Sequence, residues 1–305
     1  MEAREPLFLI HILDGYSFRN LMGIVKHEIN QTSMILSEKS IEISFISSNK
    51  KSGHRIIINT MECVNWSYNL RDEDGDLYEE YPIAFDTTEF FNITKSIGKR
   101  DGIKIYLLPD DNKLSVQLLK VSTKDPGSAE IFFVNILQAE HSRYTSNIYT
   151  SEPNIRVLAK NFTDMCGCVI DQKCEFLCVE GDDSGLIFKG IQANKSESYI
   201  KRYDAQNSSY MRQENIQLAS NIDDIANMLK NVNIEKKNGT KGLSLNVVSN
   251  NSISIKIPIV TIKGLSKVHN CCPNNALLKF YVEKGKPLKI QCSISTYGDY
   301  EIFLV

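Results

Sequence analysis

Basic side chains recur on one face of several predicted helices, where they could contact the phosphate groups of a nucleic acid. The first helix spans Tyr16–Asn30 and carries Arg19 and Lys26 on its polar side, two helical turns apart. Residues at helical spacing form its apolar side, namely Phe18, Leu21, Met22, Val25 and Ile29. A single helix of this kind usually lies on a core with its charges in water, so the binding hypothesis depends on repetition.

The same arrangement returns in two further predicted helices, Thr87–Ser96 and Thr261–Asn270. Each has an apolar side at helical spacing and basic residues opposite that side or directly after the last turn. The basic residues of these two segments are Lys95, Lys99, Arg100, Lys263 and Lys267. Repetition of one pattern in distant parts of the chain favours a shared surface over three unrelated solvated faces.

A fourth predicted helix, Phe162–Asp171, departs from this pattern. It carries Asp164 and Asp171 where basic residues would fall, with Gly167 between them, and Lys173 follows its end. The departure leaves two interpretations open. Either the shared surface is not uniformly positive, or the register assigned to this helix is wrong.

The remaining reactive residue types show no spacing typical of catalysis or metal binding. The eight cysteines contain no Cys-x-x-Cys pair, and the five histidines contain no pair at a ligand interval. The acidic segment Arg71–Glu80 lacks the glycine and glutamate positions of a calcium-binding loop. No nucleophile with a general base and no phosphate-binding loop is recognisable. We therefore expect no enzyme activity, no metal and no cofactor, and cysteines that are buried in a reducing compartment.

Composition is that of an ordinary globular protein. The chain has 305 residues, of which 42% are hydrophobic and 24% charged, and its formal net charge is −2. This length favours two domains. A net charge near zero does not indicate nucleic-acid binding unless the basic residues gather on one surface. The first residues, Met1–Pro6, do not resemble a signal peptide, and no apolar run approaches the roughly 20 residues of a membrane span.

Alternating strands and one polar segment divide the chain. Short apolar runs bounded by turn residues predict strands on both sides of the helices. Gln138–Pro153 is polar, lacks a strong period and ends in proline, which is typical of a linker. The predicted domains are residues 1–137 and 154–305, joined by a linker at 138–153.

The second half repeats the order of the first. The segment PNIRVLAKNFTDMCGCVI repeats the pattern of FLIHILDGYSFRNLMGIV. From Phe18 and Phe162 onward the two helices match without a gap. Later, Ile253–Ile259 and its following helix repeat Ile83–Phe85 and Thr87–Ser96. Each half is therefore one helix, several strands, a second helix and more strands. The predicted fold class is α+β with an internal duplication.

Three stretches resemble sliding DNA clamps of the proliferating cell nuclear antigen (PCNA) type. They are DGYSFRNLMGIVKHEINQTSMILSEKSIEISFISS, FDTTEFFNITKSIGKRDGIKIYLL, and LSKVHNCCPNNALLKFYVEKGKPLKIQCSISTYGDYEIFLV. The resemblance covers nearly the whole chain at low identity. It implies the DNA clamp fold, with two similar domains per chain, and a homotrimeric ring in which helices line a hole for duplex DNA and antiparallel sheets lie outside.

The resemblance also implies a function and its site residues. The protein would be a polymerase processivity factor and a docking platform for replication and repair proteins, acting inside the cell at sites of DNA replication, in the nucleus or in a cytoplasmic viral factory. Its partners would be DNA of any sequence, a DNA polymerase, a clamp loader and other proteins with clamp-binding motifs, with no membrane involved. The implied DNA contacts are Arg19, Lys26, Lys95, Lys99, Arg100, Lys263 and Lys267.

Two further surfaces follow from the resemblance. Ring closure would pair the edge strand Glu130–Leu137 with the region Tyr199–Tyr203 of the next subunit. Partner proteins would insert aromatic anchors into an apolar pocket beneath the linker. The implied pocket residues are Ile46, Ile148, Pro287, Phe303 and Leu304.

One alternative stays open from the sequence. The low identity and the acidic helix are compatible with a clamp-fold protein that is monomeric or does not slide, such as a polymerase accessory protein or a transcription factor. The richness in Asn, Ile, Lys and Ser is typical of AT-rich genomes and suggests a protist or a large DNA virus.

Overall fold

The computed structural model describes residues 5–121, 130–138, 149, 152–153, 155–182, 185–194, 196–204 and 253–305. The first half forms, in order, β1 (Phe8–Ile12), α1 (Gly15–Glu28), β2 (Gln31–Leu36), β3 (Ser40–Ile46), β4 (Ser52–Asn59), η1 (Thr60–Glu62), β5 (Asn65–Tyr68), β6 (Tyr81–Asp86), α2 (Thr87–Thr94), β7 (Gly102–Leu107), β8 (Lys113–Leu119) and β9 (Glu130–Asn135). The second half forms β10 (Ile155–Leu158), α3 (Ala159–Asp171), β11 (Phe176–Asp182), β12 (Gly185–Ile191), β13 (Glu197–Asp204), β14 (Ile253–Pro258), α5 (Ile259–Leu265), η2 (Val268–Cys271), β15 (Leu277–Tyr281), β16 (Leu288–Ile294) and β17 (Gly298–Leu304).

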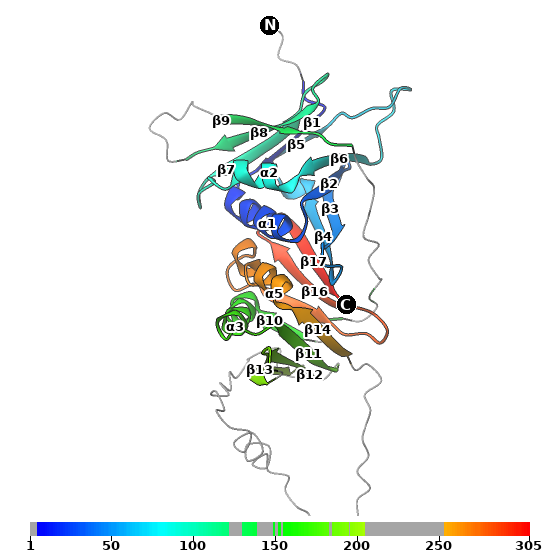
Figure 1. Ribbon diagram of the computed structural model, residues 1–305. Coiled ribbons are helices and arrows are strands. Elements are labelled where there is room, and N and C mark those ends of the chain that lie inside the picture. The colour runs from blue at the N-terminus through cyan, green and yellow to red at the C-terminus, as the bar shows by residue number, and fades with distance from the viewer. Residues whose placement is uncertain are drawn as a thin grey trace, which may run out of the picture.

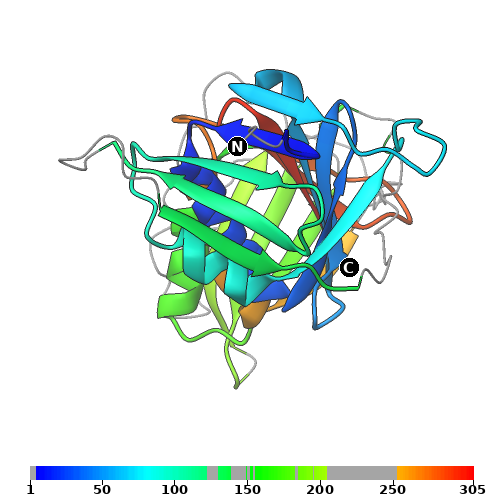
Figure 2. The same ribbon diagram turned by 90° about the horizontal axis from the view of Figure 1, so that it is seen from above.

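The described strands form three antiparallel sheets. A five-stranded sheet has the order β5-β1-β7-β8-β9, and a four-stranded sheet has the order β13-β12-β11-β14. Between them lies an eight-stranded sheet, β10-β15-β16-β17-β4-β3-β2-β6 (Figure 1). Seen from above, the five-stranded sheet lies nearest the viewer (Figure 2). None of the described helices is long and apolar enough to cross a bilayer.

The sheet orders repeat between the two halves, as the sequence predicted. In the first half β6-β2-β3-β4 are neighbours, and in the second half β14-β11-β12-β13 follow the same order. Likewise β1-β7-β8-β9 corresponds to β10-β15-β16-β17. Each helix follows the equivalent strand in both halves. The predicted α+β fold with two topologically similar units is therefore confirmed.

The two halves are joined through β4 and β17 at the centre of the eight-stranded sheet. Their register runs from Ser52 opposite Leu304 to Ile58 opposite Gly298. A Cβ atom at Gly298 would lie 2.3 Å from the carbonyl oxygen of Ile57, so a larger residue would push the two strands apart. The glycine of the YGD turn thus allows β17 to begin in close contact with β4.

Helix α1 begins and ends where its sequence dictates. The side chain of Asp14 caps it by accepting a hydrogen bond from the Ser17 amide at 3.0 Å. Four residues of its apolar stripe, Phe18, Leu21, Met22 and Val25, are buried, and Ile29 directly after the helix is partly buried. In α2, Asp86 caps the Glu89 amide in the same way at 2.7 Å. Local capping and tertiary burial therefore agree along both helices.

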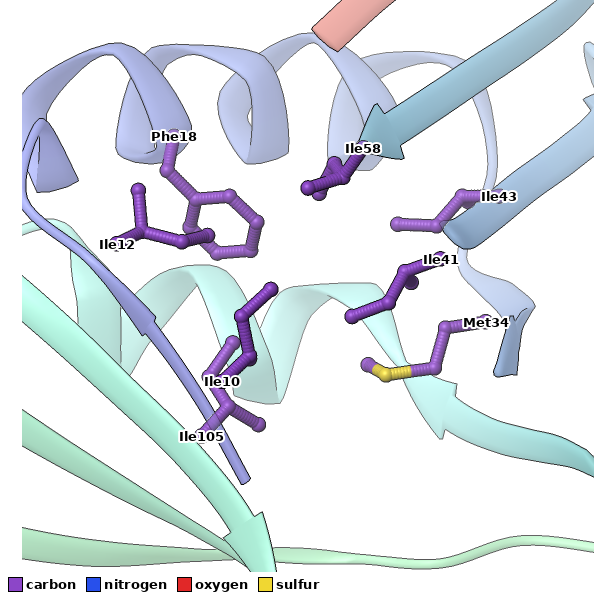
Figure 3. Close-up of a pocket in the computed structure, with 8 residues that line it drawn as sticks. All are labelled: Ile10, Ile12, Phe18, Met34, Ile41, Ile43, Ile58 and Ile105. Atoms are coloured by element: carbon purple, nitrogen blue, oxygen red, sulfur yellow. The ribbon is translucent and has the colours of Figure 1, made fainter. Parts of the chain in front are cut away.

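The core beneath α1 is closely packed around one small cavity of about 10 Å³. Phe18 of α1 faces Ile10 and Ile12 of β1, and Ile105 of β7 lies beneath Ile10 (Figure 3). Met34, Ile41, Ile43 and Ile58 complete the lining. Because every lining side chain is apolar and the space is about that of one water molecule, this cavity is a packing defect and not a ligand site.

Several elements differ from the sequence prediction. The helix expected at Thr261–Asn270 is two pieces, α5 and η2, because the Ser266 hydroxyl donates to the Lys263 carbonyl at 2.9 Å and competes with the helical pattern. Strand β5 lies within Met61–Leu70, where the sequence favours neither helix nor strand, and β11 was not predicted. Most of the predicted linker, residues 138–153, lies outside the described residues.

Candidate nucleic-acid interface

Four helices lie together on one side of the sheets, in the order α2, α1, α5, α3 (Figure 1). Helix α1 contacts α2 on one side and α5 and η2 on the other, and α5 contacts α3. The helices of both halves therefore build a single surface. The basic residues that the sequence assigned to different helices lie on or shortly after α1, α2 and α5.

Lys26 lies at the junction of α1 and α2. Its Nζ is 5.0 Å from the centre of the Phe91 ring, and its side chain is half-buried. Gly23 faces the same ring, and a Cβ atom there would lie 3.1 Å from Phe91 Cε2. The absence of a side chain at Gly23 lets α2 approach α1 closely, which holds the Lys26 ammonium at the edge of both helices.

Arg19 has a different role from the one its sequence position indicated. Its Nη1 donates to the carbonyl oxygens of Ile97 at 2.8 Å and Lys95 at 3.5 Å, at the end of α2. Its guanidinium carbon lies 4.6 Å from the centre of the Tyr16 ring. These contacts satisfy the carbonyls that the helix end leaves open. Arg19 therefore fixes the end of α2 against α1 and has less freedom to bind a phosphate.

The other implied basic residues are exposed, and none forms an ion pair with another described residue. They are Lys95, Lys99, Arg100, Lys263 and Lys267. Lys263 and Lys267 are four residues apart, on α5 and just after it. Exposed positive charges of this kind, together with the half-buried Lys26, can contact phosphates without reading bases.

Helix α3 confirms the register that the sequence assigned to it. Phe162, Met165, Cys166 and Val169 are buried, so the acidic positions belong to the exposed side. Asp164 and Asp171 are exposed there, and Asp164 accepts a salt bridge from Lys160 at 2.9 Å. The prediction missed Lys160 because it began the helix at Phe162, whereas α3 begins at Ala159. A fully positive helical surface is therefore excluded at α3.

We call the contact of α1 with α5 and η2, where the helices of the two halves meet, the seam. Polar contacts across the seam fix these helices relative to one another. Asn20 donates to the Asn270 carbonyl at 3.1 Å, and His27 Nε2 lies 2.9 Å from the Val260 carbonyl oxygen. A Cβ atom at Gly264 would lie only 2.4 Å from a carboxylate oxygen of Glu28. Glycine at this position allows the helices of the two halves to touch, and so sets the spacing between their basic residues.

The seam encloses a carboxyl group in unusual surroundings. Glu28 is 5% exposed, and burial raises its pKa to about 7. His54 lies 3.9 Å away, but its ring nitrogens contact the Tyr300 hydroxyl at 2.7 Å and Ser52 Oγ at 2.8 Å. Burial lowers the pKa of His54 to about 3. Near neutral pH, His54 is uncharged and gives Glu28 no ionic partner.

Replacing Glu28 with Gln is expected to change how stability depends on pH. The folded pKa of Glu28 exceeds its ordinary value of 4.5, so the wild-type chain loses stability as pH rises from 4.5 through 7. His54 acts in the opposite direction, since stability is lost as pH falls from 6.5 towards 3. E28Q removes the first effect only. Its stability relative to wild type should rise by about 3 kcal/mol between pH 4.5 and pH 8.

Urea denaturation of both chains across this pH range measures the difference. Glu38→Gln, at an exposed site, is the matched control and should leave the pH dependence as in wild type. An E28Q-to-wild-type difference that stays constant with pH would contradict the assignment.

The residues implied for partner docking do not all share one surface. Phe303 and Leu304 are consecutive on β17, so they point to opposite faces of the sheet, and Leu304 belongs to the hydrophobic core. Ile46 is 48% exposed, whereas Phe303 is buried. Pro287 accepts a hydrogen bond from the Tyr149 hydroxyl at 2.5 Å. Ile148 lies outside the described residues, and Tyr149, its neighbour in the linker, was missed by the sequence prediction.

Comparison with known proteins gives a consistent result at the level of the fold. No family model matches the chain, and no curated protein matches its sequence. Similar solved structures include the PCNA2–PCNA3 complex from Sulfolobus tokodaii, with 13% identity, a TM-score of 0.67, and coverage of 97% of this chain and 98% of that one. PCNA from Entamoeba histolytica has 10% identity, a TM-score of 0.66 and coverage of 99% of both chains. PCNA from Thermococcus kodakaraensis has 13% identity, a TM-score of 0.66, and coverage of 98% and 99%. The chain therefore has a PCNA-type DNA clamp fold.

Proposed function

We propose that this protein is a sliding clamp: a homotrimeric ring that encircles duplex DNA, increases polymerase processivity and docks other replication and repair proteins. One observation carries the proposal. The joint that links the two halves inside one chain can be repeated between chains, because the equivalent strands β9 and β13 are edge strands among those that the structure describes.

The duplication gives each strand of this joint a counterpart in the other half of the chain. Within the chain, β4 of the first half pairs with β17 of the second half. The counterpart of β4 in the second half is β13, and the counterpart of β17 in the first half is β9. Both β13 and β9 pair on one side only among the described strands. Pairing β9 of one chain with β13 of the next would repeat the internal joint head to tail, and such contacts form a ring when the rotation closes.

The side chains of these edges are suited to a buried joint. Ile131 and Phe133 alternate on β9, and they are 46% and 56% exposed. On β13, Ile200 and Arg202 alternate on the face opposite the buried Tyr203. Apolar residues on an unpaired edge strand invite pairing with another chain unless a partner covers them. A neighbouring subunit would remove both the open edge and the exposed apolar area.

The helical surface supports the DNA part of the proposal. In a ring built by this joint, the helices of all subunits would share one side, with their lysines around a central hole. Contacts would be made to phosphates of any sequence, and retention would depend on topology as well as on affinity. This makes the mixed charge of α3 tolerable, since no single helix has to bind tightly. A polymerase and a clamp loader would be the expected partners, at sites of DNA replication.

Helix α3 also supports a second candidate. Its exposed Asp164 and Asp171 would repel phosphates, and they align with the uncharged Asn20 and with His27 of α1. A clamp-fold protein that stays monomeric, or that binds DNA without sliding, would tolerate such a helix equally well. It would act as a polymerase accessory protein or as a transcription factor.

Two measurements distinguish these candidates. Sedimentation at micromolar concentration should give the mass of three chains. After loading, the protein should remain on closed circular DNA in high salt and should leave linear DNA through its free ends. A monomer that binds circular and linear DNA equally would contradict the sliding clamp and favour the second candidate.

A further inference from the structure

A row of side chains crosses the eight-stranded sheet on the face away from the helices. The register places Ile46 opposite Gly53, Gly53 opposite Phe303, Phe303 opposite Lys289, and Lys289 opposite Tyr281. Residues directly opposite one another in neighbouring strands share a face. These five residues, which we call the docking row, therefore form one continuous strip across five strands.

Tyr149 of the linker lies on the docking row. Its ring centre is 5.9 Å from that of Tyr281 and 6.2 Å from that of Phe303. The Nζ atoms of Lys286 and Lys289 lie 5.2 and 5.5 Å from the ring centre. The phenol hydroxyl donates to the Pro287 carbonyl at 2.5 Å. Tyr149 thus has apolar, cationic and hydrogen-bonding contacts at once, whereas Ile46 at the other end of the row is half exposed.

Exposed lysines lie in the turns at both ends of the docking row, whereas the carboxylates of Glu301 and Asp299 act on Tyr281 within it. Lys50 and Lys51 lie in the turn between β3 and β4, beside Ile46, and Lys284 lies in the turn between β15 and β16, beside Tyr281. These three lysines are exposed and make no ion pair within the described part of the chain. Lys286 and Lys289, in contrast, are paired with Glu283 and Glu301. Each end of the row therefore has lysines without an ion-pair partner among the described residues.

The linker also carries an acidic residue whose charge acts on Tyr281 of the row. Glu152 follows Tyr149 by three residues. Burial raises the pKa of the Tyr281 phenol, and the negative charge of Glu152 adds to this effect. The docking row therefore holds a tyrosine, and a carboxylate follows that tyrosine by three residues and acts on the same surface.

We infer that the docking row binds partner peptides that carry a tyrosine followed by an acidic residue, and that these displace Tyr149 and Glu152 of the chain itself. The inference rests on the proposed function, because the partners would be proteins that the clamp recruits. Tyr149 is then an internal competitor. A partner has to replace both the ring contacts and the hydroxyl contact to Pro287, so tyrosine is preferred over phenylalanine as the anchor.

The test uses the linker sequence itself as the probe. A fluorescein-labelled peptide of residues 145–153, TSNIYTSEP, is titrated with the wild-type chain and with Tyr149→Ala. If Tyr149 occupies the row about nine-tenths of the time, its removal should strengthen binding about tenfold. Tyr78→Ala removes an exposed tyrosine from another surface and should bind the peptide as weakly as wild type. Equal affinity of wild type and Tyr149→Ala would overturn the inference.

Altered probes test the chemistry, with Tyr149→Ala as the receptor. A peptide with Phe at position 149 should bind about three- to tenfold more weakly, because it lacks one hydrogen bond. A peptide with Gln at position 152 should bind more weakly at low salt, and this difference should vanish at high salt. The double variant Lys51→Glu/Lys284→Glu, built on Tyr149→Ala, should remove the preference for the acidic peptide. Indifference to both peptide changes would overturn the inference.

Failure of this inference can be separated from failure of the proposed function. The mass of the wild-type assembly and its retention on circular DNA decide the sliding clamp without reference to the docking row. A trimer that slides but shows no competition by Tyr149 refutes only the inference drawn here. A wild-type chain that stays monomeric refutes the proposed function even if the peptide binds.

Discussion

Replacing Lys26, Lys95, Lys263 and Lys267 together with alanine is expected to abolish stimulation of polymerase processivity while the trimer stays intact. These four lysines lie on or directly after α1, α2 and α5, and three of them are exposed. Each lysine that contacts a phosphate contributes about 0.9 to the slope of log affinity against log salt. The variant should therefore bind duplex DNA more weakly and with a slope lower by up to about four per contacting subunit.

The matched control removes four lysines from outside the helices. Lys39, Lys113, Lys256 and Lys279 are exposed on strands and turns, and their replacement by alanine changes the net charge equally. If total charge were the cause, both variants would lose DNA binding. We expect the control to keep both its affinity and its salt slope. Unchanged processivity in the helix variant would refute the assignment of this surface to DNA.

Arg19 is left out of the helix variant because the structure shows that its guanidinium holds the end of α2 against α1. Helical spacing correctly puts Arg19 on the polar side of α1. It cannot tell that the end of α2 lies 2.8 Å from the Arg19 guanidinium, because that contact joins residues 78 positions apart. Replacing Arg19 would disturb the α1–α2 packing as well as the charge. Spacing within one helix identifies a face, but the neighbouring helix decides which groups on that face are free.

The predicted architecture came from patterns that are local or repeated. Asp14 and the apolar stripe of α1 predict that helix without any tertiary information. The repeat of the pattern from Phe18 at Phe162 extends the prediction to α3. Strand β11, by contrast, carries the mixed segment Phe176–Asp182, whose pairing with β12 and β14 is stabilised by partners distant in sequence. Such strands depend on the sheet around them and have a weak local signal.

The docking residues illustrate the same limit and one avoidable error. Alternation along a strand would have separated Phe303 from Leu304, since consecutive residues cannot line the same face. The sheet register that aligns Ile46, Phe303 and Tyr281, however, depends on five strands from both halves of the chain. The resemblance to clamps supplied the general position of the surface. Only the three-dimensional structure reveals that Tyr149 already lies on it.

A double substitution of Ile131→Asp and Phe133→Asp on β9 is expected to leave the protein folded but monomeric. Both side chains are exposed in the single chain, so the charges are tolerated there. In the proposed β9–β13 joint they would become buried without partners, which costs about 2–5 kcal/mol. The dissociation constant of each joint should rise by about 30-fold to several thousandfold. Sedimentation at micromolar concentration would then give the mass of one chain.

The control for this variant places the same charges on other exposed apolar residues. Leu13 and Val121 are 65% and 67% exposed and lie outside both edge strands. Leu13→Asp/Val121→Asp should remain trimeric, which separates loss of the joint from a general effect of added negative charge. The β9 variant should also fail to stay on circular DNA although its helical lysines are unchanged, because a single subunit cannot encircle the DNA. Retention of that variant on circular DNA would mean that lysine contacts alone hold the protein, and the ring would then be unnecessary.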